Sequence, residues 1–300
     1  MLFGDGGVYE GCWKDDMQHG HGTFKDDDQE YDGDWIDGQQ HGYGTLTLND
    51  GSISYAGEWK DGFMHGYGRE VNRSTNIQMG WVSDLKGLDD PSTNDNVWGL
   101  RTNDTYEGED CDKDNVSTLI YEGEFSGGSW HGRGKLILPT GDIYEGEFAD
   151  GCLHGQGTLS FSISKAVYEG RWENGMRNGH GVLSYEDGAA FYDGMWKNND
   201  QNGHGVFVND EGMYEGEWRD GYQHGKGKMT YINRDLYIGE WERGMRHGKG
   251  VLIQLNGDVY DGEWRNDMSV GVRCSQDEQD ELEKDEEAAT WNDTFDTFFS

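Results

Sequence analysis

Residues 214–231 read YEGEWRDGYQHGKGKMTY, and this stretch contains the unit from which most of the chain is built. Its first half places Tyr214, Gly216 and Trp218 two residues apart, and its second half alternates in the same way. A period of two puts such residues on one face of a β-strand. The Asp-Gly dipeptide between the halves is typical of a hairpin turn. The stretch therefore predicts one β-hairpin.

The first half of this unit, Tyr-x-Gly-x-Trp or Tyr-x-Gly-x-Phe, recurs along the chain. The copies begin at Tyr9, Tyr31, Tyr55, Tyr121, Tyr144, Tyr168, Tyr192, Tyr214, Tyr237 and Tyr260. Each copy is followed by a second motif, such as His-Gly-Lys-Gly at residues 247–250, and then by a short apolar run. The repeat predicts successive hairpins of about 23 residues in an antiparallel meander.

The glycines of the motif have a packing reason. Neighbouring strands lie about 4.8 Å apart, so a side chain facing a Tyr or Trp ring would obstruct it. We therefore expect a column of aromatic rings alternating with glycine gaps along one face. The other face carries charged residues such as Glu145 and Glu147 and is expected to be solvated. The predicted fold is all-β, an elongated single-layer sheet that nearest-neighbour contacts stabilise.

The succession of Tyr-Glu-Gly-Glu-Trp, a turn, His-Gly-Lys-Gly and an apolar run resembles the MORN repeat. The resemblance covers residues 1–69 and 121–273. It implies an extended meander of MORN hairpins. Relatives join such repeats to lipid-kinase domains, to a methyltransferase domain or to a membrane anchor, whereas others consist of repeats alone. This chain resembles the repeat-only type, which includes radial spoke head proteins and protist cytoskeletal scaffolds.

Composition and pattern divide the chain into four segments. Residues 1–69 and 121–274 are blocks of repeats, and residues 70–120 break the pattern. This middle segment is interpreted as decayed repeats that continue the sheet, or alternatively as a loop that binds a partner. Residues 275–300 form an acidic tail, either disordered or an amphipathic helix that caps the aromatic face. The residues of that candidate self-capping helix face are Trp291, Phe295, Phe298 and Phe299.

The charge of the chain narrows its partners. It has 59 acidic residues against 24 Lys and Arg, a formal net charge of −35. Such a field repels phosphate backbones and anionic lipid head groups, so no nucleic-acid partner is expected and lipid is disfavoured. No signal peptide or transmembrane segment is visible, which favours a cytoplasmic protein, with a cytoskeletal or ciliary association as one hypothesis.

No motif for catalysis, metal binding or a cofactor stands out, so the prediction is a protein that is not an enzyme and has no cofactor. Gly-x-Gly occurs in every unit without the following helix that a phosphate loop needs. A histidine recurs at one repeat position, but equivalent positions lie about 10 Å apart, which is too far for shared zinc ligation. Paired carboxylates repeat in one solvated environment, whereas acid–base catalysis needs two.

The leading hypothesis is a non-enzymatic scaffold whose aromatic face binds an amphipathic helix of a protein partner, or a second copy in a homodimer. The alternative for each ring is that its own neighbours already satisfy it. The candidate partner-binding residues are Trp35, Trp59, Trp172, Trp196, Trp218, Trp241, Trp264, Tyr168, Tyr214 and Tyr237.

Two other functions remain open from the sequence. The first is phospholipid binding through the one local basic strip, formed by Lys226, Lys228, Arg243, Arg246 and Lys249. The second is a regulatory module that acts on a separate enzyme such as a lipid kinase.

Overall fold

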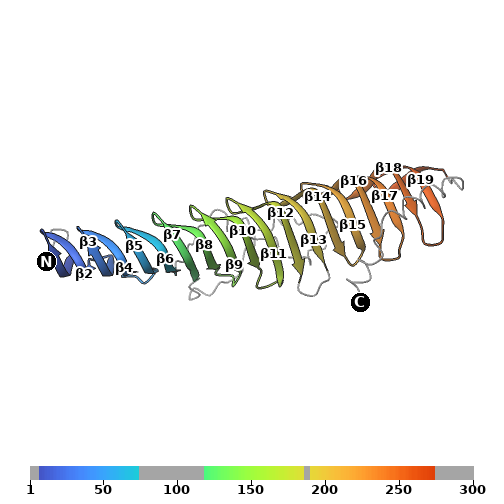
Figure 1. The fold of residues 1–300 in the computed structure, drawn as a ribbon. Coiled ribbons are helices and arrows are strands. Elements are labelled where there is room, and N and C mark those ends of the chain that lie inside the picture. Colours follow the sequence, from blue (N-terminus) through green and yellow to red (C-terminus); the bar gives the residue numbers. More distant parts are fainter. Residues whose placement is uncertain (1–6, 74–117, 186–189, 274–300) are drawn as a thin grey trace. The chain divides into compact units, whose positions relative to one another are not determined.

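The computed structural model describes residues 7–73, 118–185 and 190–273, and every regular element within these ranges is a β-strand (Figure 1). The described residues form two compact units, one of residues 7–73 and 118–176 and the other of residues 177–185 and 190–273. The predicted all-β class is confirmed. The described part of the chain contains no helix that could span a bilayer. The predicted tail lies outside the described residues.

The first unit is an antiparallel meander in which each strand pairs with the next. Glycine stands opposite glycine at the centre of each pairing, for example Gly33 opposite Gly44 and Gly44 opposite Gly57. The strands are β1 (Val8–Lys14), β2 (Met17–Lys25), β3 (Gln29–Ile36), β4 (Gln39–Leu48), β5 (Ile53–Lys60), β6 (Phe63–Asn72), β7 (Leu119–Ser126), β8 (Ser129–Ile137), β9 (Ile143–Ala149), β10 (Cys152–Ser160) and β11 (Ala166–Glu173).

The second unit repeats this plan. Its pairings again place glycine opposite glycine, as for Gly205 and Gly216 and for Gly216 and Gly227. Its strands are β12 (Met176–Tyr185), which begins at the last residue of the first unit, β13 (Phe191–Lys197), β14 (Asp200–Asn209), β15 (Gly212–Arg219), β16 (Tyr222–Tyr231), β17 (Leu236–Glu242), β18 (Met245–Ile253), β19 (Val259–Arg265) and β20 (Met268–Arg273).

The turns inside the hairpins are the ones that the Asp-Gly dipeptides predict. Both central residues have positive φ angles, 51° at Asp61 and 83° at Gly62, which is the signature of a type I′ turn. The same pair of angles occurs at Asp220 and Gly221. Since this turn has the twist of the strands it joins, each hairpin closes with only two loop residues.

The two strands that flank the middle segment pair with each other. β6 pairs directly with β7, with Gly66 opposite Phe125 and Gly68 opposite Gly123. This register is the one that joins successive hairpins elsewhere, as with Gly42 opposite Trp59. No further strand therefore lies between β6 and β7, and the interpretation of the middle segment as decayed repeats stays a prediction. Residues 74–117 themselves lie outside the described residues.

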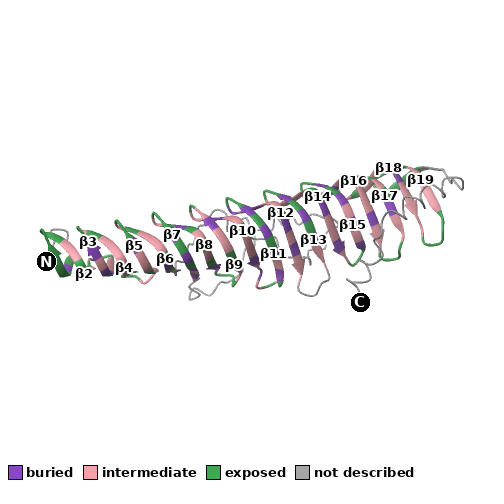
Figure 2. Cartoon of the chain, in the orientation of Figure 1, coloured by how far each residue is buried: buried purple, intermediate pink, exposed green. Residues whose placement is uncertain are grey.

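Burial alternates along the strands, as a single layer with one packed face requires (Figure 2). In β7 the side chains of Leu119, Tyr121 and Phe125 are buried, whereas Glu122 and Glu124 are exposed. We name the face that carries the Tyr-x-Gly-x-Trp residues the ladder face. The face that carries the intervening residues is the open face.

Candidate functional site

Aromatic rings form a continuous ladder along the ladder face of each unit. At seven motif positions the Trp or Phe stands between the Tyr of its own hairpin and the Tyr of the preceding one: Trp35, Trp59, Phe125, Phe148, Trp172, Trp218 and Trp241. Trp35 illustrates the contact, because it lies 5.1 Å from Tyr31 and 5.3 Å from Tyr9 between ring centroids. The ring planes meet at 87° and 81°, the edge-to-face geometry that the charge distribution of aromatic rings favours.

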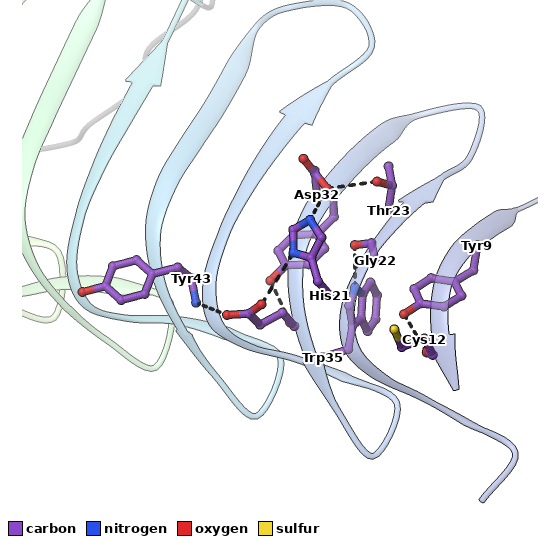
Figure 3. Close-up of polar contacts among 10 residues, drawn as sticks. Tyr9, Cys12, His21, Gly22, Thr23, Asp32, Trp35 and Tyr43 are labelled. Carbon is purple, nitrogen blue, oxygen red and sulfur yellow. Dashed lines mark hydrogen bonds and ion pairs between the residues drawn. The ribbon is translucent and has the colours of Figure 1, made fainter. Parts of the chain in front are cut away.

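The buried Trp and Tyr of the ladder also satisfy their polar atoms within the sheet. The indole Nε1–H of Trp35 donates to the carbonyl of Gly22 at 2.9 Å, and that of Trp218 donates to Gly205 at 3.2 Å. The hydroxyl of Tyr31 donates to the carbonyl of Asp34 at 3.1 Å (Figure 3 shows the equivalent bond of Tyr9). These bonds fix both ring orientations, so the ladder is a core in its own right.

The tyrosine hydroxyls of the ladder have strongly altered acidity. Burial raises the pKa of these phenols above its ordinary value, and neighbouring carboxylates raise it further in most of them. The phenols therefore stay protonated as hydrogen-bond donors throughout the physiological range. This effect is found at Tyr31, Tyr55, Tyr121, Tyr144, Tyr214 and Tyr237.

The predicted partner-binding rings do not form an open apolar trough. None of them is more than 6% exposed, and rings of their own or adjacent hairpins pack against them. This corrects the expected exposed surface and agrees with the alternative in which neighbours satisfy the rings. Whether any of them binds a partner stays a prediction. The residues concerned are Trp35, Trp59, Trp172, Trp196, Trp218, Trp241, Trp264, Tyr168, Tyr214 and Tyr237.

A recurring carboxylate has a structural role that the sequence analysis missed. Gly33 and Asp34 of β3 pair with Gly44 and His41 of β4, so the two intervening residues of β4 bulge out. The N–H of the second bulged residue, Tyr43, donates to Oδ2 of Asp34 at 3.2 Å (Figure 3). The same bond joins Tyr67 to Glu58, Arg133 to Glu124 and Lys226 to Glu217. The sequence signal is an acidic residue directly before the ladder Trp or Phe.

We expect Glu58→Ala to lower the free energy of unfolding by about 1 kcal/mol, since the Tyr67 N–H loses a charge-assisted partner. Oε1 of Glu58 accepts that bond at 3.0 Å. Glu58→Gln keeps an acceptor oxygen and is expected to cost less. Urea unfolding of the two variants measures the difference, and equal midpoints for them would contradict a hydrogen-bonding role.

One partly buried carboxylate departs from the repeat. Glu70 takes the place of an apolar residue on the ladder face, where its backbone pairs with Tyr55 on one side and Tyr121 on the other. Its Oε2 accepts a bond from Nε1 of Trp130 at 2.8 Å, and Trp130 stacks in parallel on Tyr121. Burial raises the pKa of Glu70 above its ordinary value, and the bond from Trp130 lowers it only in part.

This environment predicts a pH-dependent stability. Because the pKa of Glu70 is higher in the folded state, its contribution is fully present below the unfolded pKa and is lost as pH rises through the folded one. Glu70→Gln stays neutral and keeps an acceptor for Trp130, so it should be more stable than the parent at pH 7. The difference in melting temperature between parent and variant, followed from pH 4 to 7, should grow with pH. A constant difference would contradict this assignment.

The histidines of the repeat lie beside turn carboxylates. Nδ1 of His19 is 3.5 Å from Asp37, and Nδ1 of His41 is 3.7 Å from Asp61. These positions are consistent with a structural role near the turn. Within residues 7–73, 118–185 and 190–273, no three His, Cys, Asp or Glu side chains gather where they could hold a metal ion.

The predicted basic strip does not form one basic surface. Lys226, Lys228 and Lys249 lie on the open face, where each stands opposite a glutamate of a paired strand: Glu240, Glu215 and Glu263. Arg246 instead binds Asp267 and stacks on Trp264 at 4.4 Å, and Arg243 lies at a turn. The predicted self-capping residues Trp291, Phe295, Phe298 and Phe299 lie outside the described residues.

The open face holds the exposed side chains and two hollows of the first unit. One hollow, of about 500 Å³, is lined by Tyr43 and Tyr67, and its floor is the column of paired glycines. The other, of about 750 Å³, is lined by Arg133 and Lys135 and by several glutamates. Both are shallow and neither contains an arrangement of acid, base and nucleophile.

A family model for the MORN repeat matches ten segments of the chain, each beginning at a ladder tyrosine. The segments are residues 9–29, 31–53, 55–74, 121–143, 144–163, 168–190, 192–212, 214–235, 237–259 and 260–272. Together they cover well over half of the 300 residues. The protein belongs to the MORN-repeat family. A search of curated proteins found no match.

The family assignment agrees with the geometry. Each MORN segment supplies one ladder tyrosine, one ring of the Trp or Phe position and the glycines beneath them, so the family motif is the ladder itself. MORN repeats are typically non-catalytic repeat modules. A scaffold or a membrane-association role is consistent with this family.

Proposed function

We propose that this MORN-repeat protein is a non-enzymatic scaffold that binds a segment of another protein on its open face. The observation that supports the proposal is that the two faces differ in the exposure of their apolar and aromatic side chains. The ladder face is filled by its own rings, whereas Tyr43, Tyr67, Met195 and Ile238 stand between 42% and 67% exposed on the open face. Exposed aromatic and apolar side chains on a rigid sheet are suited to protein contact.

Binding through the ladder face would require its rings to be displaced. Removing a buried Trp from such an environment costs about 3–5 kcal/mol, which the partner would have to offset at each ring. The open face needs no such rearrangement, because its exposed side chains already project from paired strands. The proposal therefore places the contact on the open face, and a homodimer through the same face is an outcome of the test.

The proposal also concerns the larger assembly in which the scaffold acts. The ten MORN segments support a place in a cytoskeletal or ciliary structure. The membrane-association alternative has less support, because the lysines of the basic strip stand opposite glutamates and the net charge is −35. Regulation of a separate enzyme would use the same contact, with that enzyme as the partner.

Site-specific photo-crosslinking tests this proposal. A photoreactive phenylalanine analogue replaces Tyr67 or Ile238 on the open face, or Leu255, which is 69% exposed in a loop, as the matched control. In native extract we expect covalent adducts from the first two positions and none from the third. Adducts from Leu255 alone, or from no position, would contradict an open-face scaffold. Sedimentation velocity identifies a dimer, and flotation with anionic vesicles identifies lipid binding.

A further inference from the structure

The hollow over β3–β6 has the construction of a binding groove. Gly33, Gly44, Gly57 and Gly68 stand opposite one another in successive strands, so their column crosses the sheet. Any side chain at these positions would project to the ladder face, where it would meet the Tyr rings. The floor on the open face is therefore bare backbone, and the rows of residues on either side form the walls.

Two tyrosines stand along one wall of this groove. Tyr43 and Tyr67 occupy the same repeat position in β4 and β6, and they are 67% and 54% exposed. The backbone N–H of each is held by a carboxylate, Asp34 or Glu58, at 3.2 and 3.0 Å. The hydroxyl of Tyr67 donates to Glu122 at 3.0 Å. Both rings thus rise from a fixed backbone while their surfaces remain available.

We propose that this groove binds a proline-rich segment of the partner protein in the polyproline II conformation, with a Lys or Arg at one end. This inference rests on the proposed function and names the chemistry of the partner. Equivalent residues of successive hairpins lie two strand spacings apart, about 9.6 Å. Polyproline II repeats every three residues, about 9.3 Å. Prolines three residues apart can therefore stack on Tyr43 and on Tyr67 in turn.

The spacing separates this occupant from an added strand. A β-strand presents side chains to one side every two residues, about 6.8 Å, which does not match the tyrosines. Aromatic-lined grooves on rigid surfaces are the usual receptors for polyproline II segments, since that conformation costs little entropy to fix. An amphipathic helix, about 10 Å or more across with its side chains, is the competing occupant and is included in the test.

The charges at the two ends of the groove determine the orientation of the bound peptide. At the end of the groove nearest β2, His21 lies between two carboxylates, 3.4 Å from Asp32 and 3.5 Å from Asp34 (Figure 3). Both carboxylates are about half exposed, and because two carboxylates face one imidazole this end is anionic. Arg69 lines the other end of the groove. A cationic residue of the ligand is therefore expected beside Asp32 and Asp34, where the attraction weakens with salt.

Fluorescence anisotropy on the full chain tests the inference with labelled peptides. The probes are RAPPAPPAPPA, its acidic counterpart EAPPAPPAPPA, its non-proline counterpart RAGGAGGAGGA, and a basic amphipathic helical peptide. We expect saturable binding of the first, at least tenfold tighter than the second and third, with a preference over the second that falls as salt rises. No saturation by RAPPAPPAPPA up to roughly 1 mM, or tighter binding of the helical peptide, would overturn the inference.

Variants locate the binding. Tyr43→Ala and Tyr67→Ala should each weaken RAPPAPPAPPA at least tenfold without changing the melting temperature, because both rings are exposed. Asp32→Asn should reduce the preference for the basic over the acidic peptide. Leu255→Ala, in an exposed loop of the other unit, is the matched control and should change nothing. Unchanged binding in both tyrosine variants would refute the site.

The two proposals fail in different ways. If a photoreactive residue at position 67 captures a partner that RAPPAPPAPPA does not displace, the open-face scaffold stands and the proline-rich ligand is wrong. If no partner is captured, the proposed function itself is wrong.

Discussion

Gly146→Ala is expected to lower the free energy of unfolding by about 3 kcal/mol or more, because the added methyl group has no space. A Cβ at Gly146 would lie 2.5 Å from the Cα of Gly157 and 2.5 Å from the hydroxyl of Tyr144. The first obstacle is backbone of the paired strand, and the second is a buried ring that donates to Glu147 at 3.0 Å. Neither can move without opening the ladder.

Gly151→Ala is the matched control for this variant. Gly151 lies in the neighbouring turn with a φ of 79°, and a Cβ there would meet no atom within 4 Å. The left-handed conformation alone should cost about 1–2 kcal/mol. Urea unfolding gives the free energies, and hydrogen exchange of the β9 and β10 amides shows whether the loss is local. Similar losses in the two variants would mean that ring and glycine packing does not stabilise the sheet.

Trp172→Ala is expected to cost about 3–5 kcal/mol, the usual range for removing a fully buried Trp. Trp172 is completely buried between Tyr144 and Tyr168, with ring centroids 5.5 and 5.1 Å away. Its Nε1 also donates to the carbonyl of Gly157 at 3.2 Å. Truncation leaves a cavity in a single layer, and we expect exchange protection to fall first in β9–β11.

Trp172→Phe is the comparison variant, because it keeps an aromatic ring and removes the indole N–H. The chain itself uses Phe125 and Phe148 at this repeat position, where they make the same edge-to-face contacts with Tyr121. We therefore expect a loss well below that of the Ala variant, with about 1 kcal/mol from the missing indole hydrogen bond. Thermal unfolding monitored by circular dichroism compares the variants. An equally large loss for Phe and Ala would show that ring shape, rather than burial of an aromatic ring, decides stability.

The hairpins, their antiparallel order and the glycine column could be predicted from the sequence. The reason is that Tyr144, Gly146 and Phe148 follow a period of two, and this period is a local property of a strand. The Asp-Gly dipeptides likewise specify their turn within two residues. Whether residues 70–120 add strands between the two blocks could not be decided from the sequence, because they contain fragments of the motif. Only the pairing of Gly68 with Gly123 shows that the sheet closes across the gap.

The site could be predicted only in part, because exposure depends on neighbours that are distant in sequence. Trp59 could be placed on the ladder face from its spacing, but its burial follows from Tyr31 and Tyr55 on its two sides. Glu58 belongs to the row of charged residues that the repeat places in solvent. The bulge that lets Glu58 accept a hydrogen bond from the N–H of Tyr67 forms only when the hairpin closes. The exposure of Tyr67 could not be told from that of the other aromatic residues until its side of the sheet was known.

By itself, the order of residues determined that this chain is a row of MORN hairpins, since alternation and turn chemistry act over a few residues. The tertiary structure decided which face is occupied. Rings from adjacent hairpins interlock over the glycines and close the face that carries the family motif, so the surface left for a partner is the one on which the repeat varies, as at Tyr43 and Tyr67.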